Sequence, residues 1–263
     1  MLARLFEASP TPAEEKAHMP AWICVDQAEI PTSAVDGLPF VQALFGRPLE
    51  NLPAPQAGVS AVISNFGLEY VPASARATCC ATWLAPRGRL HLVMHARGSL
   101  VDRQAEVSLG DLTLTLEKLD FPSRVAALIK SKVSAPTDPM ERMMHGVQVR
   151  DDFNHAVNQM KAPLEERGSR DGPLLEWLML GRDIVQSATS ATLDQALERL
   201  EELRAAYGAE AARLRAMRAT ALGPDDLQAF KQELLSSGFA SAQLATLDTS
   251  AGQAAWVVQA LKA

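Results

Sequence analysis

The chain of 263 residues has a formal net charge of −6 at pH 7, and 48% of its residues are hydrophobic. This length suffices to bury a sizeable core, in one large domain or two smaller ones. An acidic chain without a run of lysine and arginine lacks the basic patch that binds nucleic-acid phosphates, so we expect no nucleic-acid partner. No apolar stretch approaches the roughly 20 residues that cross a bilayer, so we expect no membrane span.

The cysteines and the first residues bear on the compartment. The three cysteines, Cys24, Cys79 and Cys80, follow no zinc-ligand spacing, and the adjacent pair is poorly placed to form a disulfide. They favour a reducing environment. Residues 1–15 have neither a long apolar run nor a small-residue cleavage site, which argues against a secretory signal. We therefore expect a soluble, cytoplasmic protein.

The first elements in chain order are a helix and two strands. Residues 1–8 predict a helix with its apolar residues on one face. Residues 21–29, AWICVDQAE, are an apolar run that ends in an acid, as a buried strand does. Residues 40–45 form a weaker strand candidate, and prolines mark residues 47–58 as a loop.

The next three segments alternate strand, helix and strand. Residues 58–67 predict another buried strand, and residues 72–86 have helical spacing. Pro72 suits the first turn of that helix and Pro86 its end. Residues 88–98 again have the pattern of a strand. This alternation predicts a parallel sheet with helices on both faces.

The middle of the chain, residues 99–222, is predicted to be mostly helical. Its clearest segment is residues 193–217, in which apolar residues repeat every seven positions, although Glu210 interrupts the companion series. A long helix that packs on its neighbours is the favoured interpretation, and a dimeric coiled coil is the alternative. The repeating residues are Leu193, Leu200, Tyr207 and Leu214.

The last segment returns to an α/β pattern. Residues 223–239 predict an amphipathic helix with acids in its first turn and Gly238 at its end. Two strand-like runs follow, joined by residues 250–252, which is a hairpin signal.

The segment ICVDQAE resembles the second strand of the class I S-adenosylmethionine-dependent methyltransferases. In that family the acid at the strand end hydrogen-bonds the ribose hydroxyls of the cofactor, which implies this role for Asp26, with Gln27 beside it. A carboxylate suits the role because it accepts two hydroxyl protons at once. The alternative is an acid that caps the next helix.

A second resemblance covers residues 49–72, which are similar to the loop and fourth strand of the same family. Glu50 and Asn51 match the part of the loop whose backbone lies along the adenine. The acid that usually opens this loop and binds the adenine amino group is absent, and Arg47 and Pro48 lie in that region.

The carboxyl end of this strand is the place where ligands bind in open α/β sheets. The resemblance therefore implies that Asn65, Phe66 and Gly67 lie beside the methionine part of the cofactor.

The third resemblance is the final strand pair, which is similar to the antiparallel sixth and seventh strands of these methyltransferases. The resemblance implies a Rossmann-like α/β fold in three parts: residues 1–98, a large helical insertion over 99–222, and residues 223–263 completing the sheet. Residues 1–8 resemble the helix that directly follows the family's glycine-rich loop, so we expect the family's first strand and this loop to be absent from the sequence, either because the start site is assigned too late or because the gene product is truncated. Truncation would remove the central strand of the sheet and expose an apolar slot.

Two residues are candidates for binding the methyl acceptor. Tyr70 lies just past the strand of residues 58–67, and His95 lies near the carboxyl end of the strand of residues 88–98, where it is a candidate general base. A core or loop histidine is the favoured interpretation of His95. Asp151 and His155 have the spacing of half a metal site, but no second pair accompanies them, so we predict no metal.

The resemblance implies methyl transfer from the cofactor S-adenosylmethionine to a small-molecule or protein acceptor that the sequence does not identify. No general acid or base stands out, which is compatible with a sulfonium that is already activated. The first alternative is a non-catalytic protein of this fold that binds a partner through its helices, which also offer a homodimer contact. A nicotinamide-dependent oxidoreductase is a weaker third alternative, because it also needs a glycine-rich loop.

Overall fold

The computed structural model describes residues 21–38, 40–168 and 171–263, so the helix predicted over residues 1–8 lies outside the described part. The chain divides into two compact units. We call them the sheet unit (Met1–Met94, Leu222–Leu247 and Ala255–Ala263) and the helical unit (His95–Ala221 and Asp248–Ala254).

The sheet unit begins with a small parallel sheet of two strands, β1 (Trp22–Asp26) and β2 (Val41–Phe45), with Trp22 opposite Val41. The connection between them contains a short 3₁₀ turn, η1 (Thr32–Ala34), and is long enough for the crossover that a parallel pair requires. Residues 22–25 are apolar but only half-buried. A strand with this composition is normally buried on both faces.

A second, mixed sheet has four strands in the order β3-β4-β6-β5. β3 (Val59–Asn65) and β4 (Leu84–His95) are parallel, and β5 (Phe239–Thr249) and β6 (Gly252–Lys262) form the predicted hairpin. The last strand, β6, thus lies between β4 and β5. None of the described residues forms a strand that links the β1-β2 pair to β3, so the strands of the described part lie in two separate sheets.

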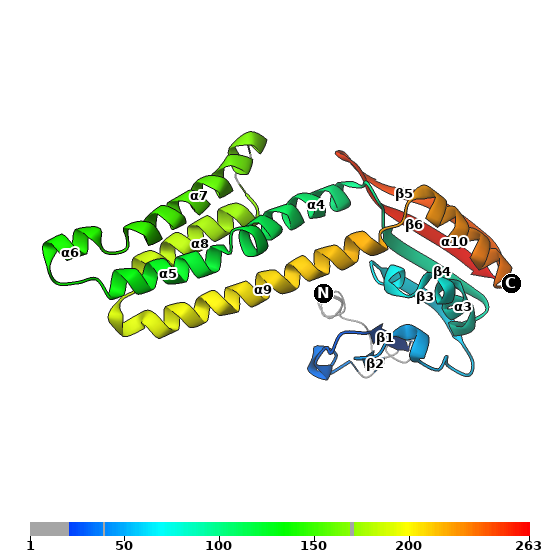
Figure 1. The fold of residues 1–263 in the computed structure, drawn as a ribbon. Coiled ribbons are helices and arrows are strands. Elements are labelled where there is room, and N and C mark those ends of the chain that lie inside the picture. The colour runs from blue at the N-terminus through cyan, green and yellow to red at the C-terminus, as the bar shows by residue number, and fades with distance from the viewer. Residues whose placement is uncertain (1–20, 39, 169–170) are drawn as a thin grey trace. The chain divides into compact units, whose positions relative to one another are not determined.

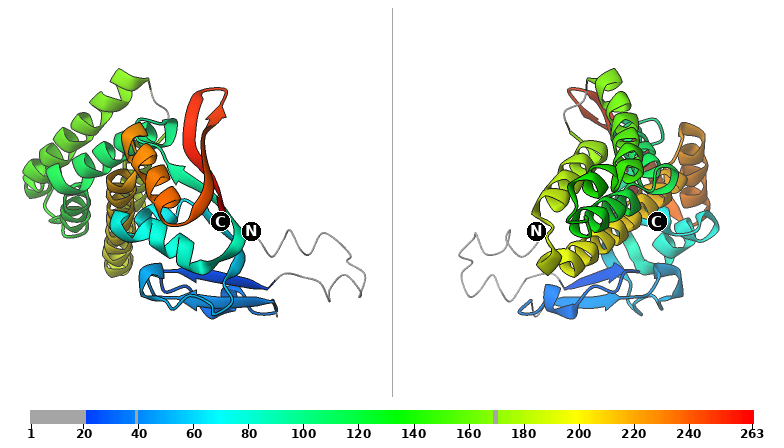
Figure 2. Two further views of the ribbon diagram at one scale, coloured as in Figure 1. Left: turned by 90° about the vertical axis from the view of Figure 1, so that its right-hand side faces the viewer. Right: turned by 60° about the vertical axis from the view of Figure 1, so that its left-hand side comes forward.

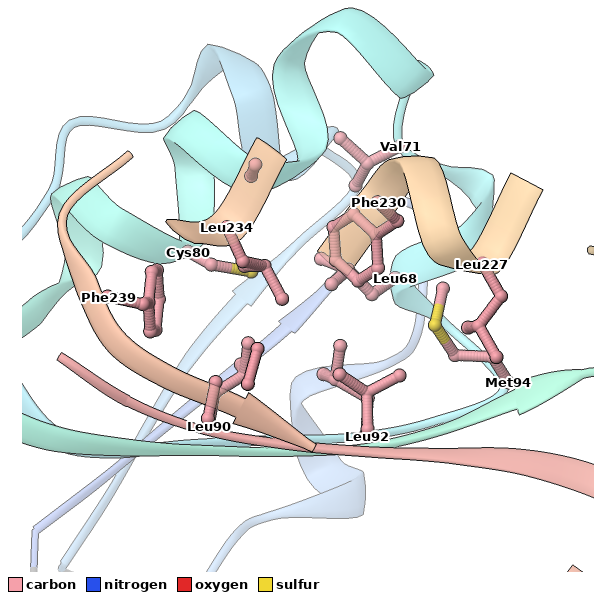
Figure 3. Close-up of a cluster of buried hydrophobic side chains, with 14 of the residues drawn as sticks. Leu68, Val71, Cys80, Leu90, Leu92, Met94, Leu227, Phe230, Leu234 and Phe239 are labelled. Carbon is pink, nitrogen blue, oxygen red and sulfur yellow. The ribbon is translucent and has the colours of Figure 1, made fainter. Parts of the chain in front are cut away.

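Two helices pack on one face of the four-stranded sheet: α3 (Ala73–Trp83) and α10 (Pro224–Ser236). Figure 3 shows their side chains meeting those of β4, with Leu90, Leu92 and Met94 directed toward the helices. All three of these side chains are buried, at 2% exposure or less. Since both helices of the described sheet unit belong to this one core, the prediction of helices on both faces is not met there.

The boundary between α3 and β4 differs from the prediction. The helix ends at Trp83 and not at Pro86, because Leu84 already pairs with Val59 at the start of β4. The ammonium of Lys262, near the end of β6, donates to the carbonyls of Ala81 and Leu84 at 2.6 and 2.5 Å. These bonds satisfy carbonyls that the end of a helix leaves without a partner.

The helical unit is a bundle in which α9 runs beside α4 and α5 (Figures 1 and 2). Its core contains Phe121 and Trp177, whose rings meet edge to face at 6.5 Å. The helices are α4 (Leu100–Leu112), α5 (Phe121–Val133), α6 (Pro139–Met144), α7 (Val147–Arg167), α8 (Pro173–Ser187) and α9 (Leu193–Thr220), with a π-helical stretch, η4 (Thr113–Lys118), after α4 and a 3₁₀ turn, η5 (Ser190–Thr192), before α9.

The residues of the seven-residue repeat in α9 pack in the interior of this bundle. Leu200 and Leu214 are buried, and Tyr207 packs its ring against Trp177 at 5.2 Å. Glu210, which interrupts the repeat, instead accepts hydrogen bonds from Arg213. The prediction of a long helix packed on its neighbours is confirmed. No helix among the described residues is both long and apolar enough to cross a membrane.

Candidate functional site

The carboxyl end of β3 presents three exposed residues in a row, Asn65, Phe66 and Gly67. Phe66 has a φ of 57°, a left-handed conformation that is costly for a bulky residue. Its side chain is 38% exposed, while its amide donates to the carbonyl of Val93 on β4 at 2.8 Å. A strained residue held in place at the end of a parallel strand is a feature of ligand sites. We call residues 64–71, which contain Phe66, the β3 turn.

A serine and a glycine fix the first half of the β3 turn. The hydroxyl of Ser64 accepts a hydrogen bond from the amide of Leu68 at 2.9 Å. A Cβ on Gly67 would lie 3.1 Å from that hydroxyl oxygen, so a side chain there would crowd the bond. After it, η3 (Leu68–Tyr70) turns the chain toward α3, with Leu68 buried in the core.

A buried arginine lies behind the second half of the turn. Arg76 of α3 is 6% exposed and donates through Nη2 to the carbonyls of Glu69 and Val71, at 2.9 and 3.1 Å. Its guanidinium also lies 5.7 Å from the ring centre of Phe230 on α10. Burial lowers the pKa of Arg76, and the negative charge of Glu69 is the largest influence that opposes this shift.

Asp26 and Gln27 follow β1 and are both exposed. Asp26 Oδ1 accepts a hydrogen bond from the amide of Ala28 at 2.8 Å, which is a local Asx turn. It does not cap a helix, since the next element begins only at Thr32. The carboxylate therefore keeps acceptor capacity on its solvent side.

The loop after β2 carries the predicted adenine-binding residues. Glu50 and Asn51 lie in η2 (Leu49–Asn51) with exposed side chains, while Leu52 is buried and anchors the loop. Arg47 Nη2 lies 3.5 Å from the carbonyl oxygen of Asn51. Guanidinium groups only donate hydrogen bonds, so this part of the loop presents donors where the family presents an acid.

The predicted cofactor residues therefore stand at the ends of strands in two different sheets. Asp26 and Gln27 follow the β1-β2 pair, and Asn65, Phe66 and Gly67 follow β3 of the four-stranded sheet. In the described part of the chain these residues do not share the edge of one sheet.

The predicted acceptor-binding residues belong to different units. Tyr70 is half-buried in η3 of the sheet unit. His95 is 9% exposed and begins the helical unit. Burial lowers the pKa of His95, Arg213 acts in the same direction, and Asp102 opposes both. A lowered pKa keeps the imidazole neutral at pH 7. On β4, Nδ1 of His91 lies 3.2 Å from Nε2 of Gln259.

Neither the predicted half-site for a metal nor the cysteines form a metal centre in the residues that the structure describes. His155 Nε2 lies 3.0 Å from Gln159 Nε2, and no group of three potential ligands occurs there. All three cysteines are free thiols, and burial raises the pKa of Cys80 to about 12.

Sequence reasoning missed Ser64 and Arg76, although one signal pointed to the arginine. Arg76 shares a helix face with Cys80 and Trp83, at spacings of four and seven residues, and both of these are buried. A charged residue on the apolar face of a helix indicates a buried hydrogen-bonding role.

Comparison with known proteins adds no family. No family model matches the chain, and no curated protein matches it. Among solved structures, a protein from Bordetella parapertussis described as a "possible exported protein" is 12% identical, with a TM-score of 0.36. The match covers 91% of this chain, which spans 52% of that protein's length.

Proposed function

We propose that the sheet unit binds S-adenosylmethionine and that the chain belongs to a methyl-transfer system with a small-molecule or protein acceptor. The observation that carries the proposal is the strand order β3-β4-β6-β5, in which the final strand lies between its hairpin partner and the parallel strands. This order supports the resemblance to class I methyltransferases, whose last two strands form such an antiparallel pair. A Rossmann-like methyltransferase fold remains part of this proposal.

The residues present fit the cofactor in part. Asp26 offers carboxylate oxygens to the ribose hydroxyls, and the exposed β3 turn with Asn65 and Gly67 offers backbone to the methionine part. When bound, the cofactor supplies a methyl group that its sulfonium has already activated.

The adenine end fits less well. Arg47 and the adenine amino group are both donors, so this pair makes no direct hydrogen bond. The described residues also contain no glycine-rich loop after a first strand. The chain's contribution is therefore binding and orientation, and we assign no residue to the transfer step.

Tyr70 and His95 remain proposed acceptor-side residues. A neutral imidazole can accept a proton, and the lowered pKa of His95 keeps it in that form. A cytoplasmic location is likewise part of the proposal, with the free thiols in its favour.

A second candidate function is partner binding without catalysis. Met140 and Met144 of α6 are 68% and 66% exposed, although both side chains are apolar. Exposed methionines suit adaptable protein contacts. Under this alternative the helical unit carries the function and the sheet unit binds no cofactor.

Calorimetric titration with S-adenosylhomocysteine, the product form of the cofactor, distinguishes cofactor binding from partner binding without catalysis. It should be run on this chain and on the longest polypeptide that its reading frame encodes. Asp26→Ala should weaken binding by about 1–3 kcal/mol, the scale of a lost charged hydrogen bond. Asp36→Ala is the matched control, because Asp36 is another exposed acid of the same unit. Absence of binding in both polypeptides would refute the proposal and favour the partner-binding candidate.

A further inference from the structure

The β3 turn combines an exposed, strained front with a buried, charged back. Asn65, Phe66 and Gly67 face solvent, whereas Leu68 and Glu69 are 4% and 1% exposed. Burial of a charged group is costly unless its hydrogen bonds are made within the protein. Behind this turn lies Arg76, which donates hydrogen bonds to backbone carbonyls of the turn and interacts with the negative charge of Glu69.

We infer that Arg76 is the positioning residue of the β3 turn: it holds the turn through the carbonyls of Glu69 and Val71, and thereby fixes the backbone that presents Asn65, Phe66 and Gly67. The inference rests on the proposed function only for the identity of the ligand that this backbone meets.

Two hydrogen bonds, an aromatic ring and the surrounding acids restrict Arg76 to this role. Its Nη2 reaches two carbonyls separated by one residue, so the guanidinium sets the distance between them. The ring of Phe230 lies within cation–π distance of the guanidinium. The acids of α10, Glu233 and Asp226, contribute further negative charge around it. The side chain of Arg76 is therefore held between α10 and the turn.

The turn is also tied to the sheet at its front. The amide of Phe66 bonds to Val93, and the amide of Leu68 bonds to Ser64. These two bonds hold the first half of the turn at the sheet, and the bonds from Arg76 to Glu69 and Val71 hold its second half, so both ends of the exposed segment are fixed only when both sets of bonds are present. The left-handed conformation of Phe66 lies between these anchors, and strained conformations persist only where the surroundings determine them.

The test compares Arg76→Met, which keeps an unbranched apolar stem but removes the charge and the donors, with Arg76→Lys, which keeps the charge. The control is Phe239→Leu, a substitution in the same core that Figure 3 shows well away from Val71. The first readout is amide hydrogen exchange at Leu68, Tyr70 and Val71 without ligand, because each of these amides is hydrogen-bonded within the turn.

Arg76→Met should speed exchange at these amides by roughly 10- to 100-fold, the effect of losing a charged hydrogen bond, and Arg76→Lys should give a smaller effect. Phe239→Leu can lower the stability of the whole sheet unit. It should therefore speed amide exchange in the turn by no more than it speeds exchange in the rest of that unit. Equal exchange in Arg76→Met and the control would overturn the inference.

The second readout is the affinity for S-adenosylhomocysteine. If the wild type binds, Arg76→Met should bind at least tenfold more weakly than the control. If the wild type does not bind, the proposed function fails, while the exchange measurement still decides whether Arg76 positions the turn.

Discussion

Arg218 donates through Nε to the carboxylate of Asp102 at 3.1 Å and so joins α9 to α4 through two residues that lie 116 positions apart in the sequence. Asp102 is buried, and its other oxygen accepts from the amide of Gly98 at 2.8 Å. The hydrogen bond from Arg218 is also the largest cause that raises the pKa of this guanidinium. The pair thus connects the last turn of α9 to the first turn of α4.

Removing the donor should therefore cost stability. Arg218→Met leaves a buried carboxylate with one donor fewer, and we expect a loss of about 2–3 kcal/mol in the free energy of unfolding. Arg215→Met on the same helix is the control, since its partner Glu117 and Arg215 itself are about half-exposed, and such pairs contribute about 0–1 kcal/mol. Urea unfolding followed by circular dichroism measures both. Equal losses would contradict the assignment of Asp102 as a buried anchor.

Gly181 in α8 is required by close packing against a ring. A Cβ there would lie 3.0 Å from Cε1 of Phe121 and 3.3 Å from Cγ2 of Val125, both fully buried. Gly181→Ala should destabilise the helical unit by about 1–3 kcal/mol through overpacking. Gly208→Ala in α9 meets nothing within 4 Å and should stabilise by up to about 1 kcal/mol. Thermal unfolding of the two variants should shift in opposite directions, and a shift of the same sign would contradict the packing around Phe121.

The pKa of His95 makes stability depend on pH with a defined sign. Burial first, and then Arg213, lower this pKa below the ordinary value of 6.5. Between the two pKa values the folded unit binds fewer protons than the unfolded chain, so the free energy of unfolding rises with pH. The contribution is present above pH 6.5 and is lost as the pH falls through the folded pKa.

His95→Gln removes this titration, so its free energy of unfolding should fall less than that of the wild type when the pH is lowered from 7 toward 5. Paired urea titrations across this range measure the difference. The imidazole resonance of His95 should also titrate below 6.5. Identical pH dependence in the two proteins would refute the burial effect.

Local patterns in the sequence predict most elements of the sheet unit. The apolar runs around Trp22 and Val62 form β1 and β3, and the amphipathic run after Gly223 forms α10. The start of β4 was not predictable locally, because Leu84 is drawn into the strand by pairing with Val59. Strand pairing is a long-range property, which a pattern of single segments does not contain.

The candidate site was predictable in its exposed residues and not in their support. Asp26 and Asn65 stand where apolar runs end, which a sequence shows directly. The role of Arg76 depends on carbonyls that the turn brings near α3, and the role of Asp102 depends on Arg218 of a distant helix. The π-helical stretch η4 also lacks a local sequence signal, and so does the left-handed conformation of Asp120 that follows it, with a φ of 42°.

Amide chemical-shift mapping shows whether the strand ends of the sheet unit bind the cofactor. On adding S-adenosylhomocysteine to the isotope-labelled chain, we expect shifts at Ala28, whose amide bonds to Asp26, and over residues 65–68. The hollow of about 230 Å³ between Asp120, Arg124 and Asp152 of the helical unit serves as the reference site. Shifts confined to that hollow, or no shifts at saturating ligand, would contradict cofactor binding at the strand ends.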